Sequence, residues 1–378
     1  MTKAPYDLWM HLGEAQSKIE HIAGVPLRPD VEKELHLVYL VKGAHATTAI
    51  EGNTLTEEQV RARVEGRLDL PKSQEYLGKE IDNIVDGYNA IMKRLLTHPN
   101  DPISPAEIAA YDFRVLDRLE LDDDVIPGQY RDHAVTVGRY LGAPQEDVEY
   151  LMLRLCDWLN SSEFQSPTPE MRVAYTVIKA VAAHLYLAWI HPFADGNGRT
   201  ARLLEYRILV ASGVPTPAAH LLSNHYNLTR ADYYRQLDRT SRPNQGLMPF
   251  LCYAVQGFVD QLREQLELVK EQQWDVTWRN YVHQIFDDQH SATHTRRRHL
   301  VLDLSRHDSP IARSQLREVS PRVAASYADR TEKTLTRDLN ELIEMKLVLR
   351  KPEGYVANRD AILAFLPGRA STNGSHRD

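Results

Sequence analysis

The sequence of 378 residues predicts a mainly α-helical protein with one short β hairpin near its middle and a small mixed domain toward its C-terminal end. Apolar residues recur at helical spacing through most of the chain up to about residue 270. Before residue 300, only the segment AVTVG at 134–138 has the composition of a strand. From His294 to Leu366 the chain carries 14 basic and 10 acidic residues, whereas its net charge is −7. This change in charge indicates a separate domain.

The composition is that of an ordinary globular protein, with 43% hydrophobic and 26% charged residues. No stretch approaches the roughly 20 continuous apolar residues of a membrane span, and the first residues do not resemble a secretory signal. Cys156 and Cys252 lie in apolar helical stretches, which favours two small buried hydrophobes over a disulfide. We therefore expect a cytoplasmic protein with no membrane partner. The negative net charge argues against nonspecific nucleic-acid binding by the whole surface.

The first third of the chain predicts only helices. Residues 31–50 place apolar side chains near helical spacing, and Glu51-Gly52-Asn53 follows as a helix stop. Helical patterns continue over 57–68 and 73–96, and Ser104 with the proline after it begins another helix as N-cap and first residue. These segments define an N-terminal helical region, residues 1–110.

The middle of the chain, residues 111–270, predicts a second domain. Residues 126–147 contain the short extended segment, followed by glycine and, after a gap, proline, as in a hairpin. Helices are expected over 148–159, 169–190 and 199–212, with Gly213 ending the last of them, and from about 230 to 270.

Residues 290–366 predict helices at 296–305, 314–319 and 331–345, then two strands around a Pro-Glu-Gly turn at 347–356. This order resembles a winged helix-turn-helix domain. The periodicity of 331–345 places Leu335, Leu339, Leu342 and Ile343 inward and Arg330, Lys333, Thr334 and Arg337 outward. The resemblance implies DNA contact through the outward residues, with Arg350 and Lys351 on the wing. A packing or dimer module is the alternative, because winged helices also bind proteins. The small polar residues 367–378 predict a disordered tail.

The segment HPFADGNGRTAR, His191 to Arg202, carries the candidate chemistry. It connects two predicted helices, and Gly196 and Gly198 allow the backbone to curl there without Cβ clashes. The N–H groups of 196–199 can then converge at the start of the second helix, where phosphate binds readily. Arg199 and Arg202 follow on the first turn and can each offer a planar fork to phosphate oxygens.

Two further side chains of this segment suit phosphoryl chemistry. Asp195 offers a hard oxygen ligand for Mg²⁺, which often takes one or two carboxylates and completes its shell with waters and substrate phosphates. His191 has an ordinary pKa near 6.5, which suits a general base at cellular pH. A glycine-containing connection with incidental charges is the plain alternative.

The segment fits the Fic signature His-x-Phe-x-Asp/Glu-Gly-Asn-Gly-Arg-x-x-Arg at every defined position, and the chain is therefore similar to the Fic (Fic/Doc) family from about residue 126 to 250. The resemblance implies a Fic-type helical bundle with a β-hairpin flap, and a nucleotidyltransferase that moves AMP from ATP to a protein hydroxyl. His191 would be the base, Asp195 would hold Mg²⁺ or Mn²⁺, and Arg199 and Arg202 would hold the β- and γ-phosphates.

The same resemblance assigns roles to residues around the motif. The backbone of Gly196, Asn197 and Gly198, with the Asn197 side chain, would form the anion hole. The flap would pair with the target through its backbone; its residues are Val135, Thr136, Val137 and Gly138. Tyr233 and Tyr234 would contact the adenine side of the nucleotide, with helix packing as the equal alternative.

The helix at about 31–52 ends in a pattern typical of an inhibitory helix. Thr47-Thr48-Ala49-Ile50-Glu51-Gly52 fits Ser/Thr-x-x-x-Glu-Gly/Asn, which many Fic proteins carry. The Glu51 carboxylate could pair with Arg202 and occupy the fork that the γ-phosphate needs. An ordinary helix end is the alternative, and some relatives use this glutamate to remove AMP, so the direction of the reaction stays open.

The sequence also allows a second class of function. The chain could be a transcriptional regulator or antitoxin-like protein whose Fic core senses a nucleotide, although His191 and Asp195 favour transfer. A few family members move phosphate or phosphocholine instead of AMP. The target protein, which could be the chain itself, is not indicated by any residue, and a homodimer is left open.

Overall fold

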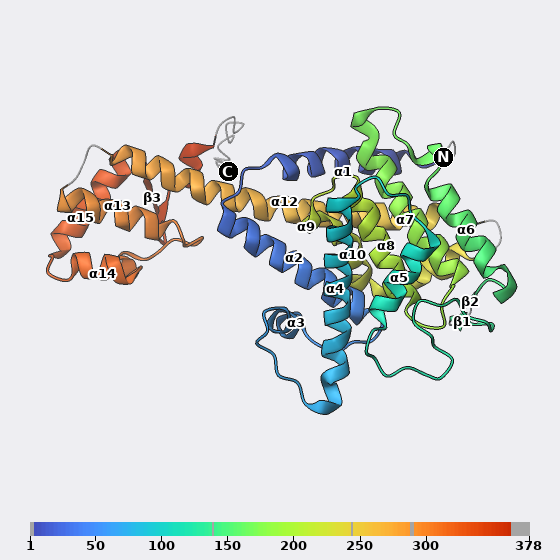
Figure 1. The fold of residues 1–378 in the computed structure, drawn as a ribbon. Helices are drawn as coiled ribbons and strands as arrows, with labels where there is room; N and C mark the ends of the chain where they lie inside the picture. Colours follow the sequence, from blue (N-terminus) through green and yellow to red (C-terminus); the bar gives the residue numbers. More distant parts are fainter. Residues whose placement is uncertain (1–3, 138–139, 243–244, 288–290, 364–378) are drawn as a thin grey trace, which may run out of the picture. The chain divides into compact units, whose positions relative to one another are not determined.

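The computed structural model describes residues 4–137, 140–242, 245–287 and 291–363 (Figure 1). The chain divides into two compact units, residues 1–268 and 269–378. The first unit is helical apart from one hairpin, and the second combines helices with another hairpin. The helices are α1 (Tyr6–Gly24), α2 (Pro29–Ala49), α3 (Glu57–Val64), α4 (Glu75–Thr97), α5 (Pro105–Val115), α6 (Val148–Leu159), α7 (Arg172–Ile190), α8 (Asn197–Ala211), α9 (Thr216–Ala219), α10 (Leu221–Leu228), α11 (Arg230–Thr240), α12 (Met248–Ile285), α13 (Ala292–Leu304), α14 (Pro321–Tyr327) and α15 (Glu332–Glu344). The strands are β1 (Thr136–Val137), β2 (Tyr140–Leu141), β3 (Val348–Lys351) and β4 (Gly354–Ala357).

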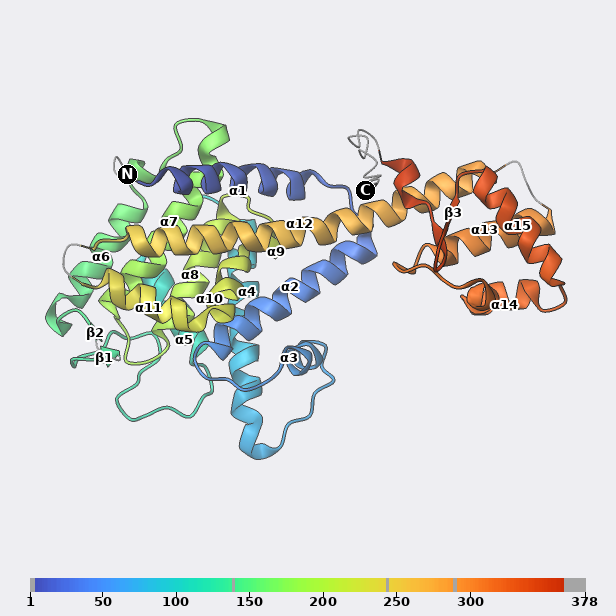
Figure 2. The same cartoon turned by 180° about the vertical axis from the view of Figure 1, so that it is seen from behind.

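The packed pair α7 and α8 forms the centre of the first unit. Helices α1 and α6 pack against α7, whereas α2, α4 and α5 pack against α8 (Figures 1 and 2). Residues Pro169–Ile190 are long and apolar enough to cross a membrane by length and composition, but 67% of the most apolar window is buried inside the protein. A helix that is apolar on nearly all sides is what the core of such a bundle requires. The connection between α7 and α8 is the motif His191 to Arg202.

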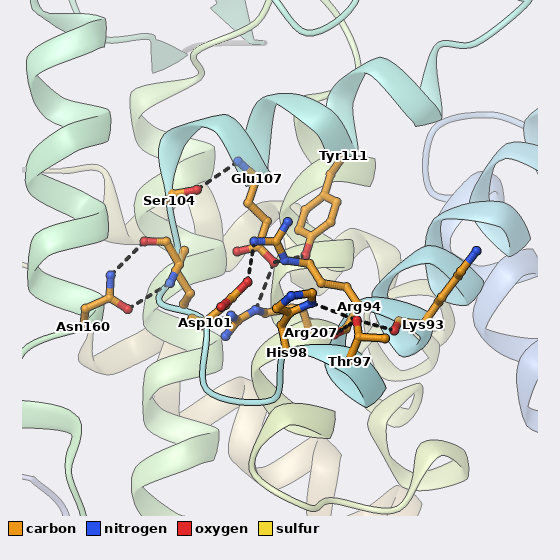
Figure 3. A network of polar contacts seen from close by, with 11 residues as sticks. Lys93, Arg94, Thr97, His98, Asp101, Ser104, Glu107, Tyr111, Asn160 and Arg207 are labelled. Carbon is orange, nitrogen blue, oxygen red and sulfur yellow. Dashed lines mark hydrogen bonds and ion pairs between the residues drawn. The ribbon is translucent and has the colours of Figure 1, made fainter.

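A buried polar network fixes α5 against α8 (Figure 3). Glu107 of α5 accepts hydrogen bonds from the Tyr111 hydroxyl at 2.7 Å and from Nε of Arg207 at 3.2 Å. Arg207 also donates to the carbonyl of Asp101 at 2.6 Å. Because Glu107 and Arg207 are both buried, each carboxylate or guanidinium group needs these partners. The network therefore holds α8 in register with the loop before α5.

The second unit has its own apolar core, made by the C-terminal part of α12, α13, α14, α15 and the β3–β4 hairpin. The two strands are antiparallel, and Ile311 forms a β-bridge with Tyr355. The predicted inward positions of α15 are confirmed, because Leu335, Leu339 and Leu342 are fully buried while Ile343 is half-buried. The predicted outward residues Arg330, Lys333 and Arg337 are exposed, and Thr334 is half-buried.

The predicted fold class, mainly α with a short hairpin, is confirmed. Several elements differ in detail from the prediction. Helix α3 ends at Val64, residues 313–318 form a 3-10 helix, and α12 continues to Ile285. Helix α14 was not predicted, although Ser320 caps it and Pro321 begins it, the same signal that found α5. The tail predicted at 367–378 lies outside the described residues, and the predicted domain limits remain predictions.

Candidate active site

The motif makes a sharp turn between α7 and α8. His191 follows the last residue of α7 with φ 50° and ψ 61°, in the left-handed region, and this conformation ends the helix. Gly196 precedes α8 with φ 78°. A Cβ at this glycine would lie 2.7 Å from Oδ1 of Asp112, so both the conformation and the space require glycine. The backbone thus turns back on itself, and the N-terminus of α8 points out of the turn.

The side chain of Asn197 holds this turn closed. Its Oδ1 accepts a hydrogen bond from the N–H of Phe193 at 2.9 Å, and its Nδ2 donates to the carbonyl of Phe193 at 2.8 Å. The Phe193 ring is buried in the core. Both the oxygen and the nitrogen of the Asn197 amide are therefore engaged in the turn. The residue can offer an anion its backbone N–H, whereas its side chain, predicted to be part of the anion hole, holds the turn instead.

Arg131 fixes the backbone that carries His191. Its Nε donates to the carbonyl of His191 at 2.7 Å, and its other nitrogens donate to the carbonyls of His133 and Ala143 at 2.6 and 2.5 Å. It therefore joins the histidine to both sides of the hairpin. Burial, and then the charge of Arg131, lower the pKa of His191. The imidazole is accordingly neutral at pH 7, the form that accepts a proton.

Asp195 and Arg199 pair with each other at the start of α8. Nη2 of Arg199 donates to Oδ2 of Asp195 at 3.0 Å, and Glu80 of α4 lies 3.7 Å from Nη1. The Asp195 side chain is half-exposed, at 52%. No group of three His, Cys, Asp or Glu side chains among the described residues could hold a metal by itself. A single accessible carboxylate fits Mg²⁺ bound together with substrate phosphates, not a cage made by protein alone.

Glu51 reaches the motif from the turn after α2. Its Oε1 lies 2.5 Å from Nη2 of Arg202, and the same nitrogen donates to the carbonyl of Thr47 at 2.9 Å. The Arg202 side chain is fully buried, and its Nε and Nη1 have no hydrogen-bond partner within the described part of the chain. Burial would raise the pKa of Glu51, but the charges of Arg202 and Arg199 outweigh it and lower that pKa. The pair is therefore ionised at neutral pH.

The two threonines of the inhibitory pattern differ in what they contact. The Thr47 hydroxyl lies 3.2 Å from the Tyr88 hydroxyl of α4, and its carbonyl is the one that Arg202 binds. The Thr48 hydroxyl instead donates to the carbonyl of Ala44 within α2. Only Thr47 therefore contacts the motif.

A cavity of about 540 Å³ opens beside these groups, a size suited to a small ligand. Its wall combines motif residues, the inhibitory glutamate and aromatic side chains. It is lined by Glu51, Tyr140, Ala188, Trp189, His191, Asn197, Gly198, Tyr233, Tyr234, Leu237 and Asp238. The structure thus brings together the predicted base, anion-binding turn, inhibitory residue and tyrosine pair. Asp195 and Arg199 line a separate cavity next to it.

The two tyrosines of the predicted pair have different surroundings. Tyr233 is buried, and its hydroxyl lies 2.9 Å from Nε2 of the fully buried His184. Tyr234 is 41% exposed, and its hydroxyl donates to the carbonyl of Ile50 at 3.1 Å, in the turn that carries Glu51. Tyr233 accordingly packs in the core and presents only an edge to the cavity, whereas Tyr234 links the cavity to the inhibitory turn.

The hairpin predicted as a flap is present but shorter than expected. Thr136 pairs with Leu141 and Val137 with Tyr140 in antiparallel register, and the carbonyl of Val135 accepts from the N–H of Gly142. Gly138 lies outside the described residues. The Tyr140 hydroxyl donates to the carbonyl of Trp189 at 2.6 Å, which ties the hairpin to the end of α7.

Sequence reasoning did not assign several residues of the site. The unassigned residues that line the cavity are Tyr140, Trp189, Leu237 and Asp238. A tyrosine or tryptophan on a helix or strand usually packs in the core, so nothing in the sequence distinguished Tyr140 and Trp189 from core residues. Asp112 was missed as well. It is fully buried, accepts from the N–H of Gly128 at 2.9 Å and contacts the turn at Gly196. Burial raises its pKa to about 7.

Comparison with known families decides how this geometry is interpreted. Residues 102–209 match the model of the Fic/DOC family. The matched segment runs from the loop before α5 to the end of α8 and contains Arg131, the hairpin and the whole turn His191 to Arg202.

Similar proteins carry the same family name. The chain is 34% identical over 227 residues to protein adenylyltransferase fic-1 of Caenorhabditis elegans, covering 58% of this chain and 39% of the relative. It is 32% identical over 212 residues to protein adenylyltransferase Fic of Nematostella vectensis, covering 55% of this chain and 44% of the relative. The chain thus spans less than half the length of these curated relatives.

Solved structures bear out the Fic-type fold. A fragment of Fic-1 from C. elegans matches with a TM-score of 0.57 and 25% identity, covering 70% of this chain and 73% of the fragment. A Fic family protein from Desulfovibrio desulfuricans G20 matches with a TM-score of 0.57 over 94% of this chain and 98% of its own. At 21% identity this second likeness concerns the fold alone.

Proposed function

We propose that the chain is a protein adenylyltransferase that moves AMP from ATP to a Ser, Thr or Tyr hydroxyl of a protein. The observation that carries this proposal is the juxtaposition of a neutral, half-buried imidazole with the N-terminus of α8 at one cavity wall. The names of the similar proteins support the same reaction. The adenosine would occupy the cavity beside Tyr234 and Trp189, and the phosphates would lie toward Arg199 and Arg202.

In the proposed reaction, the oxygen of the target hydroxyl forms a bond with the α-phosphorus of ATP. The hydroxyl proton passes to His191, the bond from phosphorus to the bridging oxygen breaks, and pyrophosphate leaves with the electron pair. The backbone N–H groups at the start of α8 would stabilise the charge that develops on the α-phosphate oxygens. Mg²⁺ or Mn²⁺ held by Asp195 would neutralise charge on the phosphates.

The chain as encoded would be restrained. The Glu51 carboxylate takes the guanidinium nitrogen of Arg202 that a γ-phosphate would use, and its charge would repel the triphosphate. The same carboxylate could orient a water for removal of AMP, so the proposal includes both directions. The target is a protein, and the chain itself is one candidate.

The test compares wild type with Glu51→Gly and His191→Ala by mass spectrometry after incubation with Mg-ATP and a cell lysate. We expect an AMP adduct on some protein of the mixture when Glu51→Gly is present and little adduct with wild type. The double variant Glu51→Gly/His191→Ala should give none. Arg28→Ala, at an exposed ion pair away from the cavity, is the matched control for mutation as such. Absence of any adduct with Glu51→Gly would refute transfer, and adducts that persist without His191 would refute its role as base.

A second function is proposed for the C-terminal unit, which would bind DNA as a winged helix-turn-helix domain. Lys333 and Arg337 are exposed on α15, and Arg350 and Lys351 are exposed on β3. In this alternative the Fic core would act as a nucleotide sensor for a transcriptional regulator or antitoxin-like protein. A duplex shift assay at rising salt tests it: a steep loss of affinity with salt supports DNA binding, and no shift at low salt contradicts it.

A further inference from the structure

A second cavity, in the C-terminal unit, has a strongly basic wall. It lies between α13 and α14, has a volume of about 700 Å³ and falls within the size range of small-ligand sites. It is lined by Ala292, Thr295, Arg296, His299, Arg322, Ala325, Ser326, Asp329 and Arg330. The wall therefore presents three arginines and one histidine against a single carboxylate. None of these residues belongs to the site described above.

Arg296 is held at the floor of this cavity. Only 6% of the residue is exposed, and its Nε donates to Oδ2 of Asp338 at 2.8 Å. The ring of Tyr327 lies 5.4 Å below the guanidinium. Asp338 also accepts from Nε of Arg297 at 2.8 Å, so one carboxylate serves two guanidinium groups. Arg297 is also paired with Glu341, at 3.8 Å from its Nη2, so the charges at the floor balance. The terminal nitrogens of Arg296 nevertheless lie outside its Nε bond to Asp338.

Arg322 is fixed from the opposite helix. Both Nε and Nη2 donate to the buried carboxylate of Asp303, which holds the plane of the guanidinium. Its side chain is nevertheless 44% exposed. An arginine that is fixed on one edge and open on the other is prepared to bind an anion with little loss of side-chain entropy.

Arg330, His299 and a helix end complete the wall. The side chain of Arg330 makes no hydrogen bond or ion pair with another residue of the described chain. Burial, and then the charge of Arg322, lower the pKa of His299. Ala292 and Thr295 belong to the first turn of α13, a helix of 13 residues whose N-terminus attracts negative charge. The charge of Arg330 and the helix end favour an anion over a cation, and the neutral imidazole can donate a hydrogen bond to it.

We propose that this cavity binds a phosphate group, carried either by a small molecule such as a mononucleotide or by the backbone of a nucleic acid. Arginine forks match the several acceptor oxygens of phosphate, and the unpaired Arg330 adds a charge that a phosphate would neutralise. The proposal is independent of the reaction proposed for the Fic segment. It also differs from base contact by α15, because most of the wall comes from α13 and α14.

The test measures binding of inorganic phosphate to the full chain by titration calorimetry at low salt. Arg199→Ala is included in every protein to weaken binding at the turn before α8, and each variant is compared with this parent because the backbone N–H groups there can still bind phosphate. The double variant His299→Ala/Arg330→Ala should bind phosphate at least roughly tenfold more weakly, because it removes one unpaired cation and one imidazole. The matched control Arg306→Ala, an exposed arginine just after α13 that does not line the cavity, should bind as well as its parent. In parallel, NMR should show the pKa of His299 rising when phosphate neutralises its cationic neighbours.

Two further arms separate the sources of the phosphate. Loss of AMP binding in the double variant with unchanged duplex DNA binding assigns the cavity to a small molecule, and the reverse result assigns it to a nucleic-acid backbone. The inference is overturned if phosphate, AMP and DNA all fail to bind at low salt. It is also overturned if Arg306→Ala weakens binding as much as the double variant. Circular dichroism checks that each variant is folded, and neither mutated side chain has a buried ion pair to lose.

Discussion

Removing the Tyr234 hydroxyl should weaken the restraint proposed for Glu51. This hydroxyl donates to the carbonyl of Ile50 at 3.1 Å and so fastens the turn that carries Glu51 to the wall of the nucleotide cavity. Tyr234→Phe keeps the aromatic ring and deletes only this bond. The substitution therefore separates the contact with the turn from any stacking on a base.

The size of the effect follows from the kind of bond. A neutral, partly exposed hydrogen bond contributes about 0.5–1.5 kcal/mol, which corresponds to roughly a 2- to 10-fold shift toward the released turn. The charged bond between Glu51 and Arg202 contributes about 1.5–3 kcal/mol, so Glu51→Gly should release the turn by roughly 10- to 150-fold. We expect Tyr234→Phe to raise the initial rate of AMP incorporation, but by less than Glu51→Gly does.

The assay follows incorporation of labelled AMP from Mg-ATP in four proteins: wild type, each single variant and the double variant. Tyr253→Phe is the control, because this hydroxyl contacts Thr229 away from the cavity. If Tyr234 acts through the turn, its substitution adds nothing once Glu51 is gone. An equal increase in both backgrounds would refute the reasoning, as would a Tyr234→Phe rate equal to that of wild type.

Three other predictions follow from buried groups. Burial raises the pKa of Asp112 from 3.8 to about 7, so its contribution to stability is full below about pH 4 and is lost as pH rises through 7. The unfolding free energy of wild type relative to Asp112→Asn should therefore fall by a few kcal/mol over that range. A difference that does not change with pH would contradict the assignment. Arg131→Lys, in the Glu51→Gly background, should lower the rate of AMP transfer by roughly tenfold or more, because one ammonium cannot reach three separate carbonyls. An unchanged rate would exclude the role of Arg131 in positioning His191. Glu107→Ala should lower the unfolding free energy, measured by urea denaturation, by about 3–5 kcal/mol, because it leaves Arg207 buried without its carboxylate. Asp30→Ala, which breaks an exposed ion pair, serves as the reference. An equal effect of the two substitutions would show that the buried network does not stabilise the fold more than an exposed ion pair does.

The sequence was sufficient for features that depend on local chemistry. The Ser104 cap with proline placed the start of α5, and the glycines of the motif placed the turn between α7 and α8. The spacing of leucines in α15 gave its buried face. The pattern at residues 47–52 put Glu51 near Arg202, although the two residues are far apart along the chain. In each case the residues that carry the signal are neighbours in sequence or belong to a family motif.

Features that depend on tertiary packing could not be predicted in the same way. Nothing in the sequence distinguishes Tyr234, which faces the cavity, from Tyr233, whose hydroxyl contacts a buried histidine. Asp112 reads as an ordinary acidic residue on a helix until α5 is packed against the turn at Gly196. The sharing of Asp338 between two arginines likewise appears only when α13 and α15 are brought together.

Gly198 restricts how the restraint can be lost over evolution. A Cβ at this position would lie 2.3 Å from Oε1 of Glu51, so any side chain there would expel the carboxylate. The same side chain would fill the space in front of α8 where the proposed reaction needs the α-phosphate. A lineage cannot therefore free the enzyme by enlarging residue 198 without also disabling it. Unrestrained descendants should differ at Glu51 or in α2, and should keep this glycine.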